Sequence, residues 1–315
     1  MSVAALKRGS EVSSREDTTK RSKHDSVCDD NTVAHDAATV VVVPLHVRYP
    51  HRRDTRVVFE EVGHVYKVDW YDDGVFTSTG ITSATSLYKP YFEEFQSDVV
   101  IANMRAGKKW TTSKYFGLSD DEIKQRWVDA ANAGGRHHLL CENYYNGVPP
   151  PLPHATATTQ FLQFADDHKH LEPFRTEWVL FSEDAHRVCG TPDMVYKSMK
   201  APEAGTLFLT IYDWKNCNAI TRYSRLMGNG VFDDVRDCNY FHYAIQLNIY
   251  KYLLEEHYGD MTVDGVVYER IRIDAMYIIV MHESRDTYLK LLLPDYQDRI
   301  RQVFQERRHQ RASQN

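Results

Sequence analysis

The chain has 315 residues, of which 42% are hydrophobic and 12% aromatic, so it can bury a sizeable core as one large domain or as a domain with an appendage. A formal net charge of −6 argues against a protein that coats nucleic acid through bulk charge, although it leaves room for a local basic cleft. The five cysteines lie far apart and form no Cys-x-x-Cys pair, which argues against a disulfide framework, a zinc ribbon and a four-cysteine iron–sulfur cluster.

The sequence contains no segment typical of a membrane-spanning helix or of a signal peptide. The longest aliphatic run, residues 40–43, is far shorter than the roughly 20 residues that cross a bilayer, and the N-terminus lacks the apolar core of a signal peptide. Together with the cysteine pattern, which fits a reducing compartment, this predicts a soluble intracellular protein.

Residues 1–38 are rich in charged and hydroxyl side chains and poor in large apolar ones, so they cannot offset their ordering entropy by burial, and we expect a disordered tail. Within it, Lys7-Arg8 and Lys20-Arg21-Ser22-Lys23 are basic clusters separated by eleven residues, the arrangement of a bipartite nuclear import signal. A solvated charged tail is the alternative. Residues 39–315 are expected to form a single domain.

The segment that follows predicts a β-hairpin over residues 57–79 and then a helix. Asp72-Asp73-Gly74 is a turn signal flanked by apolar residues. Thr82 or Ser83 can cap the helix, and Pro90 lies inside it, which predicts a kink or a late start.

A longer helix is expected next. Ser119 and Glu122 have the spacing of a capping box, and the helical pattern continues to about Tyr145. The Pro- and Thr-rich residues 148–159 predict a loop, and residues 160–172 predict a short helix.

Three β-rich runs are predicted to form an antiparallel meander at the centre of the sheet. The runs are residues 177–182, 188–196 and 207–214. If the two turns are centred near Ala185 and Glu203, Glu177 pairs with Asp193 and Asp193 pairs with Asp213, because cross-strand partners are equidistant from the turn. Three carboxylates would then line up across one sheet.

Side chains alternate along a strand, so Asp213 and Lys215 point to one face of the sheet and Trp214 to the other. Carboxylates directly opposite each other are destabilising unless something neutralises them, and hard oxygen ligands favour Mg²⁺, for which Mn²⁺ can substitute. A metal held by Asp193 and Asp213 would polarise a phosphodiester and activate a water molecule, while Lys215 stabilises the attacking hydroxide or the developing negative charge. This predicts phosphodiester hydrolysis.

The C-terminal part predicts a polar loop over residues 216–239 and a helix from about Tyr240 to His257. A β-hairpin (residues 275–282 and 286–293) and a basic helix over residues 294–310 complete the chain. The order of strands and helices predicts an α/β (α+β) fold.

Two pairs of motifs resemble those of a known family. Gly190-Thr191-Pro192-Asp193 followed by Asp213-Trp214-Lys215 resembles the bipartite motif of the PD-(D/E)XK nuclease superfamily. The spacing of Gly134, His138 and Glu142 resembles the Gly-x-x-x-His-x-x-x-Glu helix of its RecB-like and λ-exonuclease-like branch. Gln246-x-x-x-Tyr250 resembles the branch's Gln-x-x-x-Tyr helix, and the motifs follow the family's order over about residues 80–293.

The same branch includes nucleases of large DNA viruses and phages and the mitochondrial genome maintenance exonucleases, to which the chain is similar. Two departures stand out. Gly135 replaces the usual Thr after the motif glycine, and the iron–sulfur cysteines of some RecB-like members are absent.

The resemblance implies a restriction-endonuclease-like core, with a central mixed β-sheet flanked by helices. The metal ligands that it implies are His138, Asp193, Asp213 and the backbone carbonyl of Trp214. It also implies a catalytic role for Lys215, and Glu177 matches the acidic residue of the first core strand. Gln246 and Tyr250, one helical turn apart, would order Lys215 or touch the DNA near the scissile phosphate.

Several of these residues also fit a purely structural role. His138 is either a metal ligand or a histidine of the helix core, and Gln246 and Tyr250 are either active-site residues or buried polar residues bonded to the sheet. Thr82 and Ser83 cap a helix or hold a phosphate at its N-terminus.

Further basic and aromatic residues are candidates for substrate binding. Arg136 either grips a terminal phosphate or forms an exposed salt bridge. Arg222 and Tyr223 follow the catalytic strand, where Tyr223 could stack on a base. Basic pairs such as Lys108-Lys109 either track a phosphate backbone or are solvated surface.

The sequence therefore predicts a Mg²⁺-dependent DNA exonuclease that acts on single- or double-stranded ends in replication, recombination or repair. A structure-selective DNA endonuclease is one alternative. A DNA-binding module on a degenerate nuclease fold is another, although such a module has no need to keep the metal and lysine positions.

Overall fold

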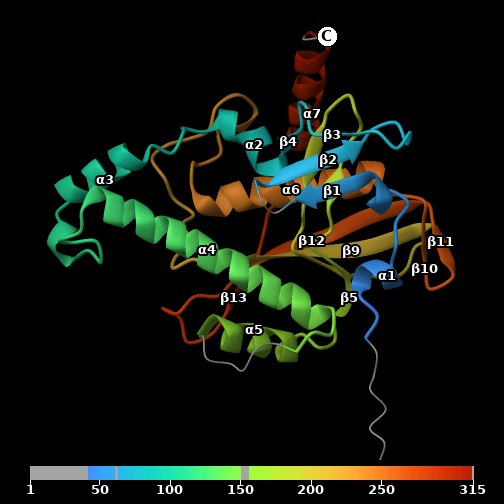
Figure 1. Cartoon of the computed structure of the whole chain (residues 1–315), viewed down its shortest axis with the longest axis horizontal. Helices are drawn as coiled ribbons and strands as arrows, with labels where there is room; N and C mark the ends of the chain where they lie inside the picture. Colours follow the sequence, from blue (N-terminus) through green and yellow to red (C-terminus); the bar gives the residue numbers. More distant parts are fainter. Residues whose placement is uncertain (1–41, 61–62, 150–155, 314–315) are drawn as a thin grey trace, which may run out of the picture. The chain divides into compact units, whose positions relative to one another are not determined.

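A mixed five-stranded β-sheet lies at the centre of the fold (Figure 1). Its strands are β5 (Glu172–Thr176), β8 (Met194–Lys197), β9 (Thr206–Lys215), β12 (Arg270–Val280) and β13 (Leu289–Leu292). In the order β13-β12-β9-β8-β5, β9 and β12 are parallel and the other neighbours are antiparallel. The predicted α+β class and central mixed sheet are confirmed.

The computed structural model describes residues 42–60, 63–149 and 156–313. These described residues group into one compact unit. The tail predicted over residues 1–38, with its two basic clusters, lies outside the described residues.

Three smaller sheets surround the central one. They are β1 (Val57–Glu60), β2 (Val65–Asp69) and β3 (Phe76–Thr77); β4 (Thr82–Ser83), β7 (Val188–Gly190) and β6 (Leu180–Phe181); and β10 (Met261–Val263) with β11 (Val266–Tyr268). Strand β4 runs parallel to β7, so the chain just before the second helix lies beside the segment that leads to Asp193.

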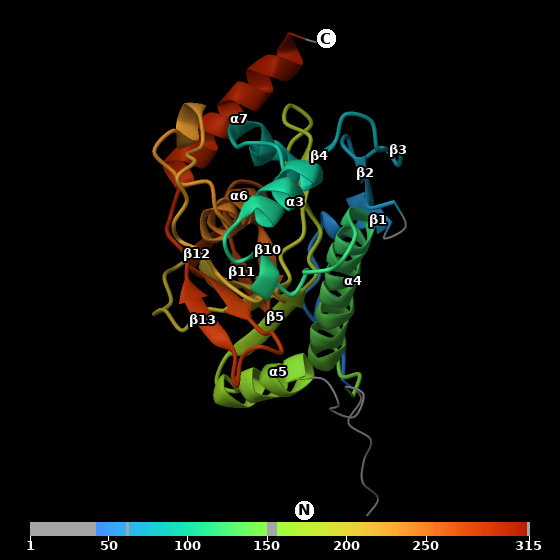
Figure 2. The ribbon, with the colours of Figure 1, turned by 90° about the vertical axis from the view of Figure 1, so that its left-hand side faces the viewer.

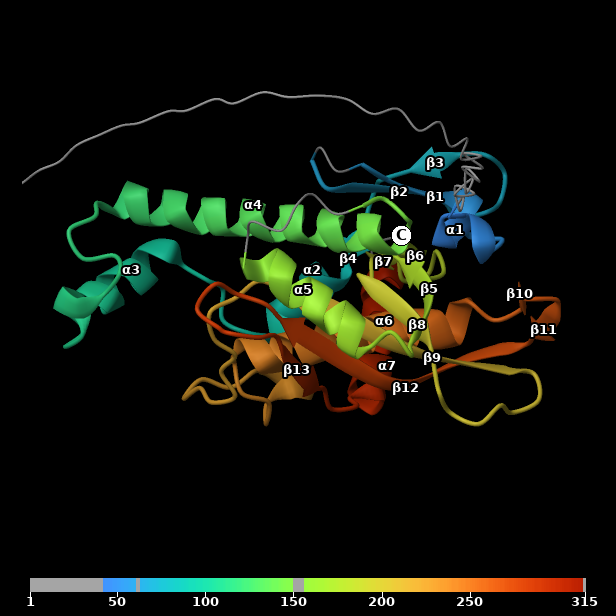
Figure 3. The same ribbon diagram turned by 90° about the horizontal axis from the view of Figure 1, so that it is seen from below.

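Helices cover both faces of the central sheet (Figures 2 and 3). They are α1 (Leu45–Arg48), α2 (Ala84–Tyr88), α3 (Ser97–Ala106), α4 (Asp120–Tyr145), α5 (Thr156–Asp167), α6 (Asn239–His257) and α7 (Gln297–Ala312), with short 3-10 helices at Asp54–Arg56, Lys89–Tyr91, Trp110–Thr112 and Gly230–Phe232. Cys141 of α4 and Phe161 of α5 share a buried cluster with Trp214, while α6 packs with Leu209 and Ile211. Because both faces are covered, nearly all of β9 is buried, which explains its almost uninterrupted apolar sequence.

The predicted capping box opens α4, the longest described helix. The Ser119 hydroxyl accepts from the backbone N–H of Glu122, and the Glu122 carboxylate accepts from the backbone N–H of Ser119. The helix ends at Tyr145, as predicted. Its first half extends beyond the sheet, so Ile123 is the only buried residue before His137.

The strand predicted over residues 177–182 forms only at Leu180–Phe181 (β6), which belongs to a smaller sheet, and the prediction is wrong for the rest of the run. Strand β5 ends at Thr176 because Glu177 adopts a left-handed backbone conformation (φ 43°) that a β-strand cannot contain. The run over residues 188–196 is likewise divided at Pro192 into β7 and β8, and these two strands belong to different sheets.

Helix boundaries were predicted less well in two places. Residues 148–159 are not all loop, since α5 already begins at Thr156, and it ends at Asp167 rather than at residue 172. Ser83 caps α2 as predicted by accepting from the N–H of Ser86, yet the helix ends at Tyr88, because Pro90 lies in a separate 3-10 turn.

The hairpin predicted over residues 57–79 is confirmed only in part. Strands β2 and β3 pair around the predicted Asp72-Asp73-Gly74 turn, but β1 adds a third strand, and the β10–β11 pair was not predicted. Among the described helices, none combines the length and the apolar character needed to cross a bilayer.

Candidate metal-binding and catalytic site

Three carboxylates line up across the end of the central sheet. Thr176 pairs with Met194, and Met194 pairs with Tyr212, so the next position along each strand holds Glu177, Asp193 and Asp213. The backbone N–H of Glu177 donates to the Asp193 carbonyl at 3.0 Å, which continues the ladder by one step. The predicted register is confirmed.

His138 of α4 completes a cluster with two of these carboxylates. Its Nδ1 lies 3.5 Å from Asp193 Oδ2 and 3.7 Å from Glu177 Oε1. One ligand atom from each of the three residues lies within 4.8 Å of the others, a spacing that a single metal ion can span. Asp213, predicted as a ligand alongside His138 and Asp193, is not a member of this close set.

Asp213 is instead paired with Lys215, as expected for side chains two residues apart on one strand. Lys215 Nζ lies 2.5 Å from Asp213 Oδ2. Asp213 is only 1% exposed, and neither carboxylate oxygen has a hydrogen bond of normal geometry among the described residues. Glu177 Oε1 is buried and without a hydrogen bond in the same way. Buried oxygens of this kind are unusual in proteins and suit the coordination of a cation.

The two aspartates differ in how readily they hold a proton. Burial would raise the pKa of Asp193, but His138, Lys215 and the N–H of Trp214 outweigh it and hold the pKa below its usual value. Burial and the neighbouring Asp193 raise the pKa of Asp213 to about 6, even though Lys215 opposes the shift. Asp193 is therefore the more firmly anionic of the pair.

The basic partners remain charged. Burial would lower the pKa of Lys215, but Asp213 and Asp193 outweigh it and hold the pKa above its usual value. Burial likewise opposes the charge on His138, yet Asp193 and Glu177 raise its pKa to about 11. The Glu177 pKa is raised to about 7, mainly by burial. Without a metal, the His138 cation thus offsets the carboxylates.

A cavity of about 470 Å³ opens onto these residues. Seven residues singled out from the sequence line it: Ser83, His138, Glu177, Asp193, Lys215, Gln246 and Tyr250. Gln246 Nε2 donates to the Tyr250 hydroxyl at 2.7 Å, so this pair on α6 lies at the site as predicted. Asp213 does not line the cavity itself and reaches it through its contact with Lys215.

Gly190 is required by the packing of this wall. A Cβ atom at residue 190 would lie 2.5 Å from Cε1 of the Tyr250 ring and 3.2 Å from Cβ of Ala84. The missing side chain therefore allows β7 to approach both α6 and α2.

The remaining predicted substrate residues lie outside the cavity. The Thr82 hydroxyl accepts from Arg307 of α7 at 2.7 Å. Arg136 lines a separate, mostly apolar cavity between α4 and α5. Arg222 stacks on Tyr240, and Tyr223 is exposed beneath the Arg236 guanidinium. None of these four residues lines the cavity at His138, so the structure does not support their predicted roles in substrate binding there.

Several lining residues, among them Tyr66 and Lys89, were not predicted as site residues from the sequence. The hydroxyls of Tyr66 and of the motif residue Thr191 share a hydrogen bond of 3.2 Å, and Lys89 adds a third cation to the lining. Tyr66 and Lys89 reach the site from the β2 strand and the turn after α2, through long-range packing that leaves no local sequence signal.

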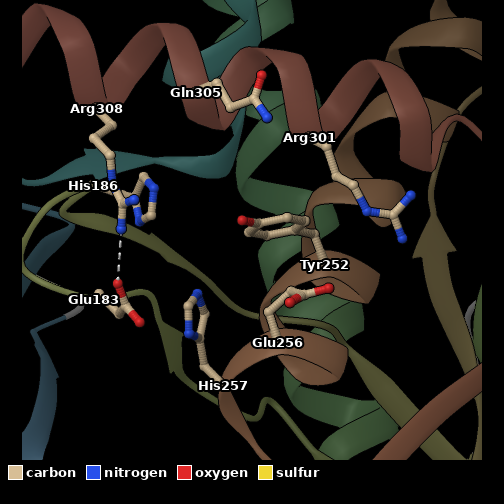
Figure 4. A pocket seen from close by; sticks show the side chains of 8 residues that line it. All are labelled: Glu183, His186, Tyr252, Glu256, His257, Arg301, Gln305 and Arg308. Atoms are coloured by element: carbon tan, nitrogen blue, oxygen red, sulfur yellow. Dashed lines mark hydrogen bonds and ion pairs between the residues drawn. The ribbon is translucent and has the colours of Figure 1, made fainter.

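Another cavity, of about 330 Å³, has a different character (Figure 4). His186 and His257 line it, and Glu183 is already paired with Arg308 at 3.3 Å. Among the described residues, the His138 cluster has three potential ligand atoms within 4.8 Å of one another. The residues that line this other cavity form no such group of three.

No model of a known protein family matches the chain, and no curated protein sequence matches it significantly. Any functional assignment therefore rests on the residues of the site.

Proposed function

We propose that the chain is a metal-dependent nuclease of the PD-(D/E)XK type that hydrolyses phosphodiester bonds in DNA, with exonuclease action favoured by the sequence resemblance. The observation that carries the proposal is the alignment of Glu177, Asp193 and Asp213 at one sheet end, with Lys215 beside them and His138 opposite. These residues surround one cavity or contact a residue that lines it.

The residues present fit a divalent cation. Asp193 and Glu177 offer carboxylate oxygens close enough to share one ion with a nitrogen of His138, and the buried carboxylate of Asp213 lies beside them, paired with Lys215. Mostly oxygen donors favour Mg²⁺ or Mn²⁺ over softer metals. A cation bound there would polarise a phosphoryl oxygen and lower the pKa of a coordinated water molecule.

Lys215 supplies a fixed positive charge. Because Asp213 and Asp193 keep it protonated, Lys215 acts as a cation rather than as a base. Its ammonium lines the cavity, where it can stabilise the negative charge that develops on the phosphate. Gln246 and Tyr250, bonded to each other on the adjoining wall, would orient the strand near the scissile bond.

Cleavage assays test the proposal directly. End-labelled linear DNA and covalently closed circles would be incubated with Mg²⁺ or Mn²⁺, using the wild-type chain and the variants Asp213→Asn and Lys215→Met. We expect both variants to lose roughly 10²-fold or more in rate, as with other preorganised charges at reacting phosphates. Inactivity of the wild type on every substrate, or unchanged activity in both variants, would overturn the proposal.

A matched control pair lies outside the site. Lys197 and Asp264 also form an ion pair, at 2.7 Å, on the far part of β8 and the β10–β11 turn. Lys197→Met and Asp264→Asn should leave the rate unchanged. Resistance of closed circles supports an exonuclease, and their linearisation supports the endonuclease alternative. A binding module would bind DNA without cutting it and would take up no Mg²⁺ through Asp193 or Asp213 in calorimetry.

A further inference from the structure

The helices α3 and α4 form an arm whose end is the loop of residues 107–118, here named the tip loop (Figures 1 and 3). It contains Lys108, Lys109 and Lys114 but no Asp or Glu, so three positive charges and no negative one give it +3, in a chain whose total is −6. All three lysines are exposed, and no ion pair involves them among the described residues.

The tip loop is held in one conformation by its own contacts. Arg105 Nη2 donates to Asp120 at 2.6 Å and to the Leu118 carbonyl at 2.9 Å, which ties α3 to the start of α4. Trp127 Nε1 donates to the Tyr115 hydroxyl at 3.0 Å. A fixed backbone presents the lysines without a further cost of ordering the loop backbone on binding.

Aromatic rings lie among these lysines. Phe116 is 54% exposed and meets Trp110 edge to face, with ring centroids 6.0 Å apart. An exposed ring among cations without ion pairs suits a nucleic-acid strand, because the cations bind phosphates and the ring contacts sugars or bases. The lysines act here as point charges, which requires no particular base sequence.

We propose that the tip loop is a second nucleic-acid contact, which binds the phosphate backbone of the substrate at a distance from the catalytic cavity. The proposal rests on the proposed nuclease function. The 18-residue step from Asp120 to His138 along α4 corresponds to about 27 Å, or about eight base pairs of duplex. The carboxylates of Glu177 and Asp193 offset part of the positive charge at the cavity, so a remote basic contact would add attraction for the phosphate backbone.

Binding without cleavage tests the inference. Fluorescence anisotropy in EDTA would compare the wild type with the triple variant Lys108→Ala/Lys109→Ala/Lys114→Ala on a duplex of about 20 base pairs and a hairpin with a stem of about five. On the long duplex, we expect the triple variant to bind roughly tenfold or more weakly than the wild type. The slope of log K against log salt concentration should become smaller by about 2.7, which is about 0.9 for each lost phosphate contact. For a long single strand, the slope should fall by about 2. The hairpin is too short to reach the cavity and the tip loop together, so it should lose less affinity than the long duplex.

A charge-matched control separates local from general electrostatics. Arg52→Ala/Lys169→Ala/Lys200→Ala removes three exposed cations from other parts of the fold and should leave both affinities within about twofold. Equal losses in the two triple variants, or an equal loss on hairpin and duplex, would overturn the inference. If the wild type cleaves DNA but the tip-loop variant binds the long duplex normally, the inference fails while the nuclease function stands. Absence of both binding and cleavage in the wild type would overturn both.

Discussion

Asp193 Oδ2 accepts a hydrogen bond from the backbone N–H of Trp214, at 2.7 Å. Trp214 lies between Asp213 and Lys215 on β9, so the bond fixes the Asp193 carboxylate to the strand that carries the other two charged groups. The same oxygen lies 3.5 Å from His138 Nδ1. The Asp193 carboxylate thus connects β9 with α4. It binds β9 through a backbone hydrogen bond and α4 through an ion pair with His138.

Two substitutions at this position should separate structure from cation binding. In Asp193→Asn the amide oxygen can still accept from Trp214, whereas Asp193→Ala leaves that buried N–H without a partner. We expect the alanine variant to be less stable than the asparagine variant by about 1–3 kcal/mol in urea unfolding. Calorimetry should show loss of Mn²⁺ uptake in both. Equal stabilities would show that the bond contributes nothing, and unchanged uptake would contradict the role as a ligand.

The buried pair formed by Asp213 and Lys215 should behave as a coupled unit. Lys215→Met leaves a buried carboxylate without its cation, which typically costs about 3–5 kcal/mol. Because the pKa of Asp213 is already raised to about 6, the carboxyl can take up a proton, so we expect the lower end of that range. Adding Asp213→Asn should restore part of the stability, measured as a coupling energy in a double-mutant cycle. Purely additive effects would argue that the two groups do not interact.

The alignment of the carboxylates could be predicted because it depends only on turn positions. Turns centred near Ala185 and Glu203 place Glu177, Asp193 and Asp213 opposite one another whether or not the intervening strands are continuous. The long helix α4 was equally predictable, because its capping box and periodicity are local properties.

The sheet that each part of the interrupted strands joins could not be predicted, because it depends on contacts between sheets. The N–H groups of Glu177 and Trp178 still bond to the carbonyls of Asp193 and Pro192, after which the chain leaves the central sheet for the one that contains β7. Pro192 is the local mark of the break between β7 and β8, because proline cannot donate to a ladder, but it does not indicate which sheet each part joins.

The position of Arg136 could have been anticipated. It lies two residues from His138, which corresponds to about 200° around an α-helix, so both cannot face one cavity. Arg222 and Tyr223 were selected for their nearness in sequence to β9, which does not determine where a loop packs. Their predicted role remains untested.

Glycine substitutions should distinguish the packed wall of the cavity from the open surface of α4. Gly190→Ala would place Cβ 2.5 Å from the Tyr250 ring, and the resulting overpacking should cost about 1–3 kcal/mol and displace Tyr250. Gly135→Ala is the control, because a Cβ there meets nothing within 4 Å and alanine favours a helix by up to about 1 kcal/mol. Thermal unfolding should therefore shift in opposite directions. A Gly190→Ala variant as stable as the wild type would show that the wall can move.

Acid sensitivity should arise in part from His257, at the end of α6. Burial, together with Arg53 and His186, lowers the pKa of His257 to about 3 from an ordinary value of 6.5. Its Nε2 is buried without a hydrogen bond among the described residues. Between these two pH values the unfolded chain binds a proton that the folded chain rejects, so stability falls as the pH falls. At pH 5 the loss should reach about 1–2 kcal/mol relative to pH 7.

Urea unfolding of His257→Gln at a series of pH values tests this origin. Glutamine cannot ionise, so the variant should lose less stability than the wild type between pH 7 and pH 5. The lowered pKa of His186 should keep part of the slope in place, mainly because that ring is also buried. His309→Gln, on the exposed surface of α7, is the matched control and should follow the wild-type curve. Parallel curves for the wild type and His257→Gln would show that the proton is taken up elsewhere.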